Sequence, residues 1–387
     1  MKKVLIGMII DGKAGGIDKY LMNFFDTVKG GDVQVDFLAN RIDPELKEQL
    51  AADGAGLYCV SGLRDPKAQY QQVCDLIRHN GYDIVYMNIS TAMAYPVLQA
   101  AHDCGVKKVI AHAHASGVDA ESRPRRWLMK LLHTLCKGKV AAYATHHLAC
   151  SEKAARWMFP RKMVESGRVK TVFNSVDTSL FRPDPQLREY FRQELGLVGR
   201  FVIGHVVNAS YPKNQLFLLR VFRRLLRREK DARLVIIGDG VRMERLRAYV
   251  KKHGLEESVQ LLGRVDVSMG YMNAFDVFAL PSKFEGLGIV LIEAQCTGVP
   301  CVASTAVPQS ACISNIFRFV PLSVNAWVDA LLKWKHHNRA DIVYENRSLL
   351  KLSKGEWRSL RGRDISMIFQ NSGAMMNQTR LIGKSFV

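Results

Sequence analysis

The sequence predicts an α/β protein of two domains, each built around a doubly wound parallel sheet. Short apolar runs, typical of buried parallel strands, alternate with longer segments of helical character along most of the chain. A length of 387 residues suits two domains of ordinary size. Hydrophobic residues make up 48% of the chain, which is sufficient for two cores.

The first domain is expected at 1–184, with a linker around Asp184–Arg200. Its predicted strands are Val4–Ile10, Val33–Leu38, Gly56–Val60, Asp83–Met87, Lys108–Ala113, His147–Cys150 and Thr171–Phe173. Its predicted helices are Tyr20–Val28, Pro44–Ala52, Pro66–His79, Ala92–Cys104 and a basic segment at Arg123–Lys139.

The second domain is expected at 201–340. Its predicted strands are Phe201–Val206, Arg233–Gly238, Val259–Arg264, Val277–Leu280 and Cys301–Ala303. Its predicted helices are Leu216–Arg228, Val241–His253, Ile289–Cys296 and Trp327–His337.

The stretch 276–304 combines the features of an anion site. A buried strand is followed by a loop that contains Gly286 and Gly288, which let the backbone approach a ligand closely. A helix begins directly after the loop. Its free backbone N–H groups and its dipole therefore point toward the loop, as in many phosphate sites.

Two carboxylates frame this loop, because Glu285 lies in it and Glu293 follows eight positions later on the helix. An acid within an apolar helix is costly to bury without a partner, and a sugar or ribose diol could donate two hydrogen bonds to it. Equally, Glu285 could be an ordinary acid near a helix N-terminus and Glu293 a core residue paired within the protein. Spacing alone does not decide between these interpretations.

A second glycine loop follows the first strand. Gly15 and Gly16 precede the predicted helix Tyr20–Val28, at a place where Rossmann-like sheets commonly meet a phosphate. The loop lacks the Gly-x-Gly-x-x-Gly spacing, so it indicates a phosphate site only weakly.

His112 and His114 lie at the end of the predicted strand Lys108–Ala113. Residues two apart on a strand face the same side, which suggests a metal site. No third ligand lies nearby in the sequence, so no metal is expected. Polar partners within the protein are an alternative role for both imidazoles.

The basic segment Arg123–Lys139 combines cations with Trp, Leu and Met at helical spacing. Its cations are Arg123, Arg125, Arg126, Lys130, Lys137 and Lys139. Such a helix could lie on an anionic bilayer. It could equally be an ordinary amphipathic helix with a solvated basic face.

The formal net charge of +19 suggests anionic partners such as nucleic acid, a membrane surface or phosphorylated substrates. No nucleic-acid-binding signature accompanies the charge, so nucleic acid is not expected. The eight cysteines are scattered without a Cys-x-x-Cys pair, as in reduced cytosolic proteins. The apolar start is interrupted at Asp11 and is interpreted as a strand rather than a signal peptide. No run of 18 apolar residues predicts a membrane span.

The loop Lys283–Gly288, followed by Glu293 and Ala294, resembles the nucleotide-sugar site of retaining glycosyltransferases with the GT-B fold. In that fold two Rossmann-like domains face a cleft. The resemblance is to the large family that includes bacterial capsule and exopolysaccharide transferases. It implies that Glu285 and the loop amides meet the donor sugar, and that Glu293 holds the ribose hydroxyls.

The resemblance covers further positions. Lys213 and Asn214 match the family's Lys-Asn pair, whose lysine shares the donor diphosphate with an arginine five residues earlier. Asn208 stands in place of that arginine. A neutral amide cannot replace a bidentate guanidinium, and one such contact is worth about 2–4 kcal/mol of transition-state stabilisation. The substitution leaves the activity of the chain open.

In the first domain, His114 resembles the family's histidine near the donor sugar, and Gly15 and Gly16 resemble its turn over donor and acceptor. The resemblance thus implies catalytic roles for His114, Lys213 and Glu285. The residues it implies for donor binding are Gly15, Gly16, Asn208, Lys213, Gly286, Leu287, Gly288 and Glu293. No metal or other cofactor is expected, because protein charges and dipoles would stabilise the leaving diphosphate.

The segment 349–387 resembles a different protein, the Q-loop region of peptide-importer ABC ATPases, with Gln370 as the glutamine of that loop. No P-loop occurs in the chain, since Gln378 stands where the motif ending at Gly383–Ser385 requires glycine. We interpret the tail as a fusion or frame junction rather than a second activity.

These patterns predict a cytosolic glycosyltransferase, peripheral on the inner face of a membrane. It would move a sugar from a nucleotide sugar, with UDP favoured, to a glycan or lipid-linked acceptor in cell-surface polysaccharide synthesis. Reaction type and retention of configuration come from the resemblance alone. The alternatives are a catalytically impaired nucleotide-sugar-binding protein or scaffold, and an ABC-transporter component.

Overall fold

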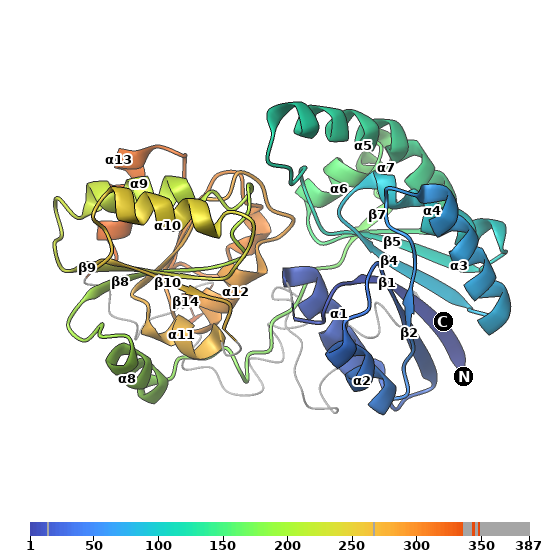
Figure 1. Ribbon diagram of the computed structural model, residues 1–387, viewed down its shortest axis with the longest axis horizontal. Coiled ribbons are helices and arrows are strands. Elements are labelled where there is room, and N and C mark those ends of the chain that lie inside the picture. The colour runs from blue at the N-terminus through green and yellow to red at the C-terminus, as the bar shows by residue number, and fades with distance from the viewer. Residues whose placement is uncertain (14, 266–267, 336–342, 345–346, 349–387) are drawn as a thin grey trace. The chain divides into compact units, whose positions relative to one another are not determined.

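The computed structural model describes the chain except residues 14, 266–267, 336–342, 345–346 and 349–387. The chain divides into two compact units between Asn174 and Ser175 (Figure 1). That division lies ten residues before 184, where the sequence placed the end of the first domain. The segment interpreted as an ABC ATPase fragment, 349–387, lies outside the described residues.

A parallel seven-stranded sheet forms the centre of the first unit, in the order β3-β2-β1-β4-β5-β6-β7. The strands are β1 (Lys2–Ile9), β2 (Val33–Ala39), β3 (Leu57–Cys59), β4 (Ile84–Ile89), β5 (Lys108–Ala113), β6 (His146–Ala149) and β7 (Val169–Thr171). The helices are α1 (Gly15–Val28), α2 (Pro44–Ala52), α3 (Pro66–Asn80), η1 (Ala92–Ala94), α4 (Tyr95–Asp103), α5 (Arg123–Tyr143), α6 (Glu152–Met158) and α7 (Arg161–Glu165).

The strand order places a topological switch point between β1 and β4, since the chain moves outward from this pair in both directions. Helices α1 and α2 cover one face of the sheet, and α3, α4 and α5 cover the other (Figure 1). Both faces are therefore buried, which explains why β4 is buried at every position.

The second unit repeats this plan with a parallel six-stranded sheet in the order β10-β9-β8-β11-β12-β13. Its strands are β8 (Phe201–Val206), β9 (Ala232–Ile237), β10 (Val259–Gly263), β11 (Val277–Leu280), β12 (Cys301–Ser304) and β13 (Phe317–Val320). Its helices are α8 (Pro185–Glu194), α9 (Gln215–Leu225), α10 (Met243–Lys252), α11 (Ser268–Ala274), α12 (Ile289–Cys296), η2 (Gln309–Ala311) and α13 (Val324–Leu332). A short antiparallel pair, β14 (Val343–Tyr344) and β15 (Arg347–Ser348), follows.

The predicted fold class is confirmed, and the predicted strands and helices lie within a few residues of the observed ones. Two differences concern the first unit. Helix α1 begins at Gly15, five residues earlier than predicted, so Gly15 and Gly16 belong to its first turn. The predicted helix Ala92–Cys104 is a short 3-10 turn followed by α4.

Gly204, in the middle of β8, is required by packing. A Cβ atom at this position would lie 2.0 Å from the ring of Phe275, so the aromatic ring occupies the space of the missing side chain. Asp276, which follows Phe275, leads into β11, and β11 pairs with β8. The close approach therefore brings together the two strands at the switch point of the second sheet.

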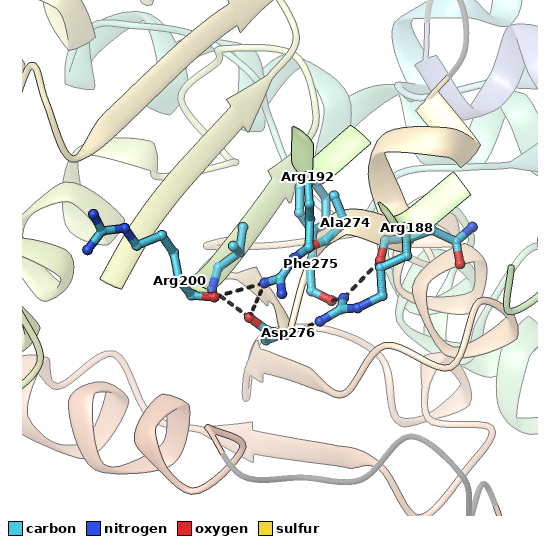
Figure 2. Close-up of polar contacts among 8 residues, drawn as sticks. Arg188, Arg192, Arg200, Ala274, Phe275 and Asp276 are labelled. Atoms are coloured by element: carbon cyan, nitrogen blue, oxygen red, sulfur yellow. Dashed lines mark hydrogen bonds and ion pairs between the residues drawn. The ribbon is translucent and has the colours of Figure 1, made fainter. Parts of the chain in front are cut away.

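Helix α8 replaces most of the predicted linker Asp184–Arg200, so that prediction is wrong. None of its side chains is fully buried, although Phe191 packs against the apolar core of the second unit, with its ring centroid 4.5 Å from that of Tyr271. In addition, Arg188 and Arg192 bind the two carboxylate oxygens of Asp276, at 2.5 and 2.6 Å, and the Val202 amide donates to the same carboxylate at 2.7 Å (Figure 2). Both guanidinium groups also donate to carbonyls at 273–275. We call these residues the Asp276 cluster; they attach α8 to the second unit.

Replacing Asp276 with asparagine should lower the free energy of unfolding of the second unit by about 2–3 kcal/mol, because two partly buried guanidinium groups lose their counter-charge. Urea unfolding measures this. The matched control is Asp329→Asn, which breaks an ion pair to Arg228 that is more than half exposed and should cost no more than about 0.5 kcal/mol. Equal losses in the two variants would contradict a structural role for the Asp276 cluster.

Candidate functional site

The second unit holds an ion pair at the carboxyl ends of its two central strands. The Lys213 ammonium group lies 2.7 and 3.0 Å from the two carboxylate oxygens of Glu285. Lys213 belongs to the loop after β8 and Glu285 to the loop after β11. The structure thus brings together two predicted site residues that are 72 positions apart in the sequence.

Further hydrogen bonds hold the two loops together. The Ser282 hydroxyl donates to Glu285 Oε1 at 2.6 Å, and the Lys283 amide donates to the Pro212 carbonyl at 2.7 Å. Asn214 adopts a left-handed conformation, with φ of 58°, and its side-chain amide donates to the Pro281 carbonyl at 3.1 Å. Asparagine tolerates this conformation better than most residues, which explains its place after Lys213.

The glycine loop leads into α12 as predicted. Gly288 has a φ of 85° and begins the helix without a side-chain cap. The Leu291 amide donates to the Gly288 carbonyl at 2.9 Å, and the helix N-terminus with its dipole faces the loop. The Leu287 side chain is buried, and only its backbone is positioned for a ligand. Glu293, one turn into α12, is only 3% exposed.

Asn208 is exposed in the loop after β8, where its carbonyl accepts from the Gln215 side chain at 3.0 Å. The turn after β9 packs against this loop. A Cβ atom on Gly238 would lie 2.2 Å from the Val207 carbonyl oxygen, and one on Gly240 would lie 2.7 Å from that of Ala209. These two glycines therefore serve close backbone packing.

Two cations lie near the same loop without having been predicted. The Lys283 ammonium group lies 3.8 Å from the centre of the Tyr211 ring, and the Arg242 guanidinium lies 5.1 Å from it. Both are within the range of cation–π attraction. Together with Lys213 they give the loop 207–214 a positive environment despite the replacement at Asn208.

His205 on β8 was also missed. Its Nδ1–H donates to the Ala279 carbonyl of β11 at 2.7 Å, so Nε2 carries the lone pair. Nε2 is buried and has no hydrogen-bond partner among the residues that the structure describes. Burial, with a smaller contribution from the nearby Lys213 charge, lowers the pKa of His205 to about 4. No motif surrounds this histidine in the sequence, so only the strand pairing identifies its neighbourhood.

In the first unit, His112 and His114 lie on one face of β5, as predicted, with ring centroids 4.1 Å apart. His112 Nε2–H donates to the Val172 carbonyl at 3.2 Å, and Nδ1 therefore accepts from the Tyr86 hydroxyl at 2.7 Å. Tyr20 in turn donates to the Tyr86 oxygen at 2.6 Å. His112 is thus a buried structural residue, and burial lowers its pKa to about 3.

His114 is 9% exposed and has a different environment. Its Nε2 lies 2.8 Å from the Asn88 side-chain oxygen on β4. Asn88 donates its amide to the Gly7 carbonyl, so its oxygen accepts and His114 Nε2 is the donor. Burial and the His112 ring hold the pKa of His114 well below its usual value. Its Nδ1 lone pair has no hydrogen-bond partner among the described residues and is the only part of the ring that could accept from a ligand.

The loop after β1 is closed by its own carboxylate. Asp18, in the first turn of α1, accepts hydrogen bonds from the backbone amides of Ile10, Asp11 and Gly12 at 2.9–3.0 Å. Burial raises the pKa of Asp18, although the three amides lower it. The amides that could bind a phosphate in a Rossmann-like sheet are thus occupied. Gly15 is exposed and Gly16 is half-buried. An acid two positions after Gly16 was the signal that sequence reasoning overlooked.

No group of three His, Cys, Asp or Glu side chains suited to a metal ion occurs in the part of the chain that the structure describes. Among the same residues, no helix combines the length and apolarity needed to cross a bilayer.

Two parallel-sheet units with polar groups at the carboxyl ends of their central strands define the architecture of GT-B glycosyltransferases. Comparison with known families agrees. Residues 200–335 match the model of the glycosyl transferases group 1, and residues 14–180 match the model of glycosyltransferase family 4.

Individual relatives point the same way. EpsF, a glycosyltransferase candidate of Bacillus subtilis, is 28% identical over 97% of this chain and 94% of its own length. An alignment of that coverage extends into 349–387. The Escherichia coli UDP-Gal:alpha-D-GlcNAc-diphosphoundecaprenol alpha-1,3-galactosyltransferase is 25% identical over 74% of this chain and 75% of its own.

Solved structures share the fold. Anabaena HepE in complex with UDP and glucose superposes with a TM-score of 0.69 at 19% identity, covering 86% of this chain and 89% of that one. WaaG, a glycosyltransferase involved in lipopolysaccharide biosynthesis, has a TM-score of 0.63 at 16% identity, over 86% and 90% of the two chains. The chain is a GT-B glycosyltransferase of the group 1 type.

The neutral His205 should make stability depend on pH. Its pKa of about 4 in the folded protein lies below the usual 6.5, so the unfolded chain binds more protons between these values. The stability contribution is complete above pH 6.5 and is lost as the pH falls toward 4, with a slope of up to about 1.4 kcal/mol per pH unit.

Urea unfolding at pH 4.5–7.5 measures this slope. His205→Asn keeps a donor for the Ala279 carbonyl but cannot titrate, so its curve should be flatter than that of the wild type. Parallel curves would mean that His205 is protonated in the folded protein or that other groups dominate.

Proposed function

We propose that this chain transfers a sugar from a UDP-linked donor to a glycan or lipid-linked acceptor, with retention of the anomeric configuration, in cell-surface polysaccharide synthesis at the inner face of the membrane. The observation that carries the proposal is the Lys213–Glu285 pair beside the N-terminus of α12. A lysine, backbone amides at the start of a helix and a buried acid, Glu293, are the groups that diphosphate and ribose require. The names of the HepE complex and of the Escherichia coli relative favour UDP and a lipid-linked acceptor.

In the proposed reaction Lys213 and the amides at Gly286–Gly288 bind the diphosphate. As the bond to the sugar breaks, negative charge develops on the leaving phosphate oxygen, and these fixed positive groups stabilise it. Lys213 would then exchange part of its contact with Glu285 for the phosphate. Glu285 would be released toward the sugar, where a carboxylate can accept hydroxyl hydrogen bonds or stabilise a developing positive charge.

The first unit would contribute His114. Its Nδ1 can accept a hydrogen bond from a sugar hydroxyl, and its depressed pKa keeps it neutral throughout the physiological range. The role is therefore orientation of the sugar rather than proton transfer. Gly15, which is exposed, and Gly16, which is half-buried, lie in the first turn of α1 and would allow close approach of donor or acceptor.

A second candidate function is binding of a nucleotide sugar without turnover. It is favoured by Asn208, which removes one phosphate contact of the family. We propose that Lys283 and Arg242, held on the Tyr211 ring, supply the missing positive potential. Comparing turnover with binding distinguishes the two functions.

Calorimetric titration with UDP tests the nucleotide site. Wild-type protein should bind UDP, and Glu293→Gln should weaken binding by at least about tenfold because two hydroxyl–carboxylate hydrogen bonds lose their charge. The matched control, Glu256→Gln, changes an exposed acid on the loop after α10 and should bind like the wild type. Absence of UDP binding, or equal binding by both variants, would contradict the proposed site.

Turnover tests the phosphate contacts. With a panel of UDP-sugars and a diphospholipid-linked acceptor, Lys213→Met should lower the rate of UDP release by about 100-fold or more, because one charge contact to the leaving group is lost. Asn208→Arg should raise it. If the wild type binds UDP but neither it nor Asn208→Arg turns over, the binding function is supported instead. The anomeric configuration of the product, determined by NMR, tests retention.

A further inference from the structure

The outward face of α5 is apolar, which reverses the usual arrangement of a surface helix. Only His133 and Val140 are buried along its 21 residues. Five large apolar side chains point to solvent, with exposed fractions of 69% for Trp127, 50% for Leu128, 42% for Leu131, 41% for Leu132 and 67% for Leu135. Residues spaced by four, together with their neighbours one position on, form a single stripe on a helix. We call these five residues the α5 stripe.

The inner side of α5 is held by polar contacts and not by the stripe. His133 Nδ1 accepts from the Ala92 amide at 2.9 Å, its Nε2 donates to the Trp157 carbonyl at 2.9 Å, and its ring stacks on the Trp157 indole at 3.9 Å. Lys137 and Lys139 bind the Arg156 carbonyl and the Tyr95 hydroxyl. The stripe is therefore not needed to attach α5, which covers the same face of the sheet as α3 and α4 (Figure 1).

The charges beside the stripe all have one sign. Helix α5 contains six cations and no acid. Arg123 and Lys130 flank the stripe on one side and Arg125 on the other, as the helical spacing requires, and all three are exposed. An apolar stripe with a tryptophan at one end, bordered by lysine and arginine, has the composition of a helix that lies in a membrane interface.

We propose that the α5 stripe inserts into the interface of a bilayer that contains anionic phospholipids, with the flanking cations on the headgroups. A second copy of this chain fits the face less well, because two such helices would bring cations against cations, whereas anionic headgroups neutralise them. The proposal goes beyond the proposed reaction and does not depend on it. A bilayer contact at α5 would hold the first unit at the surface where a lipid-linked acceptor resides.

Vesicle flotation tests the proposal on the full chain. The wild type should float with vesicles of phosphatidylcholine that contain about 30% phosphatidylglycerol. With vesicles of pure phosphatidylcholine, the floating fraction of the protein should be at least about fivefold lower. The triple variant Trp127→Glu, Leu131→Glu, Leu135→Glu should lose at least about tenfold in apparent affinity. The control variant Val198→Glu, Val241→Glu, Leu322→Glu changes three other exposed apolar residues with the same change in net charge, and should bind as the wild type.

A second measurement locates the contact. Brominated lipid should quench part of the tryptophan fluorescence of the wild type, and Trp127→Phe, which keeps an apolar ring, should lose that quenching while still floating. UDP binding and thermal unfolding, compared among the variants, separate loss of membrane binding from misfolding and from failure of the nucleotide site. Equal flotation of the two triple variants, or no flotation of the wild type, overturns the proposal. If the wild type forms a dimer and only the α5 triple variant is monomeric, the stripe would be a contact with a second copy of the chain instead.

Discussion

The buried ion pair between Lys213 and Glu285 is the interaction on which the second unit's site depends. It joins the loops that follow two adjacent parallel strands, and each charge offsets the desolvation of the other. Neighbouring residues support this arrangement. Gly204 leaves room for the Phe275 ring where β8 pairs with β11, and the Ser282 hydroxyl donates a hydrogen bond to the Glu285 carboxylate. An anionic ligand entering here would compete with Glu285 for the same ammonium group. Binding and release of the carboxylate would thus be coupled through one lysine.

The two units share a strand order but not the use of the loop at its switch point. In the second unit the loops after β8 and β11 bring Lys213 close to the N-terminus of α12. In the first, Asp18 fills the equivalent place after β1 with an internal anion. The same loop position therefore carries groups of opposite charge in the two units. At the switch point, the described loops of the second unit thus offer positive groups to an external phosphate, while the loop after β1 already holds a carboxylate.

Much of this arrangement could be predicted from the sequence, because apolar runs and glycine positions are local signals. The strand and loop around Glu285 and the face shared by His112 and His114 are examples. Contacts between distant residues leave no local signal: the Lys213–Glu285 pair spans 72 positions, and His205 acquires its properties only from pairing with β11. Helix α8 was missed for a related reason. Its arginines, Arg188 and Arg192, bind Asp276 across 88 and 84 positions, and its apolar side chains are only partly buried.

The attachment of α8 also determines which fragment of the chain can fold as an independent domain. The first strand of the second unit starts at Phe201, and a fragment beginning there would contain the whole six-stranded sheet. It would nevertheless leave Asp276 without either arginine and expose the carbonyls that they bind at the entrance to β11. The autonomous piece therefore has to include the helix before its first strand. In this protein the limit of an independent domain is decided by a charge cluster and not by the edge of the sheet.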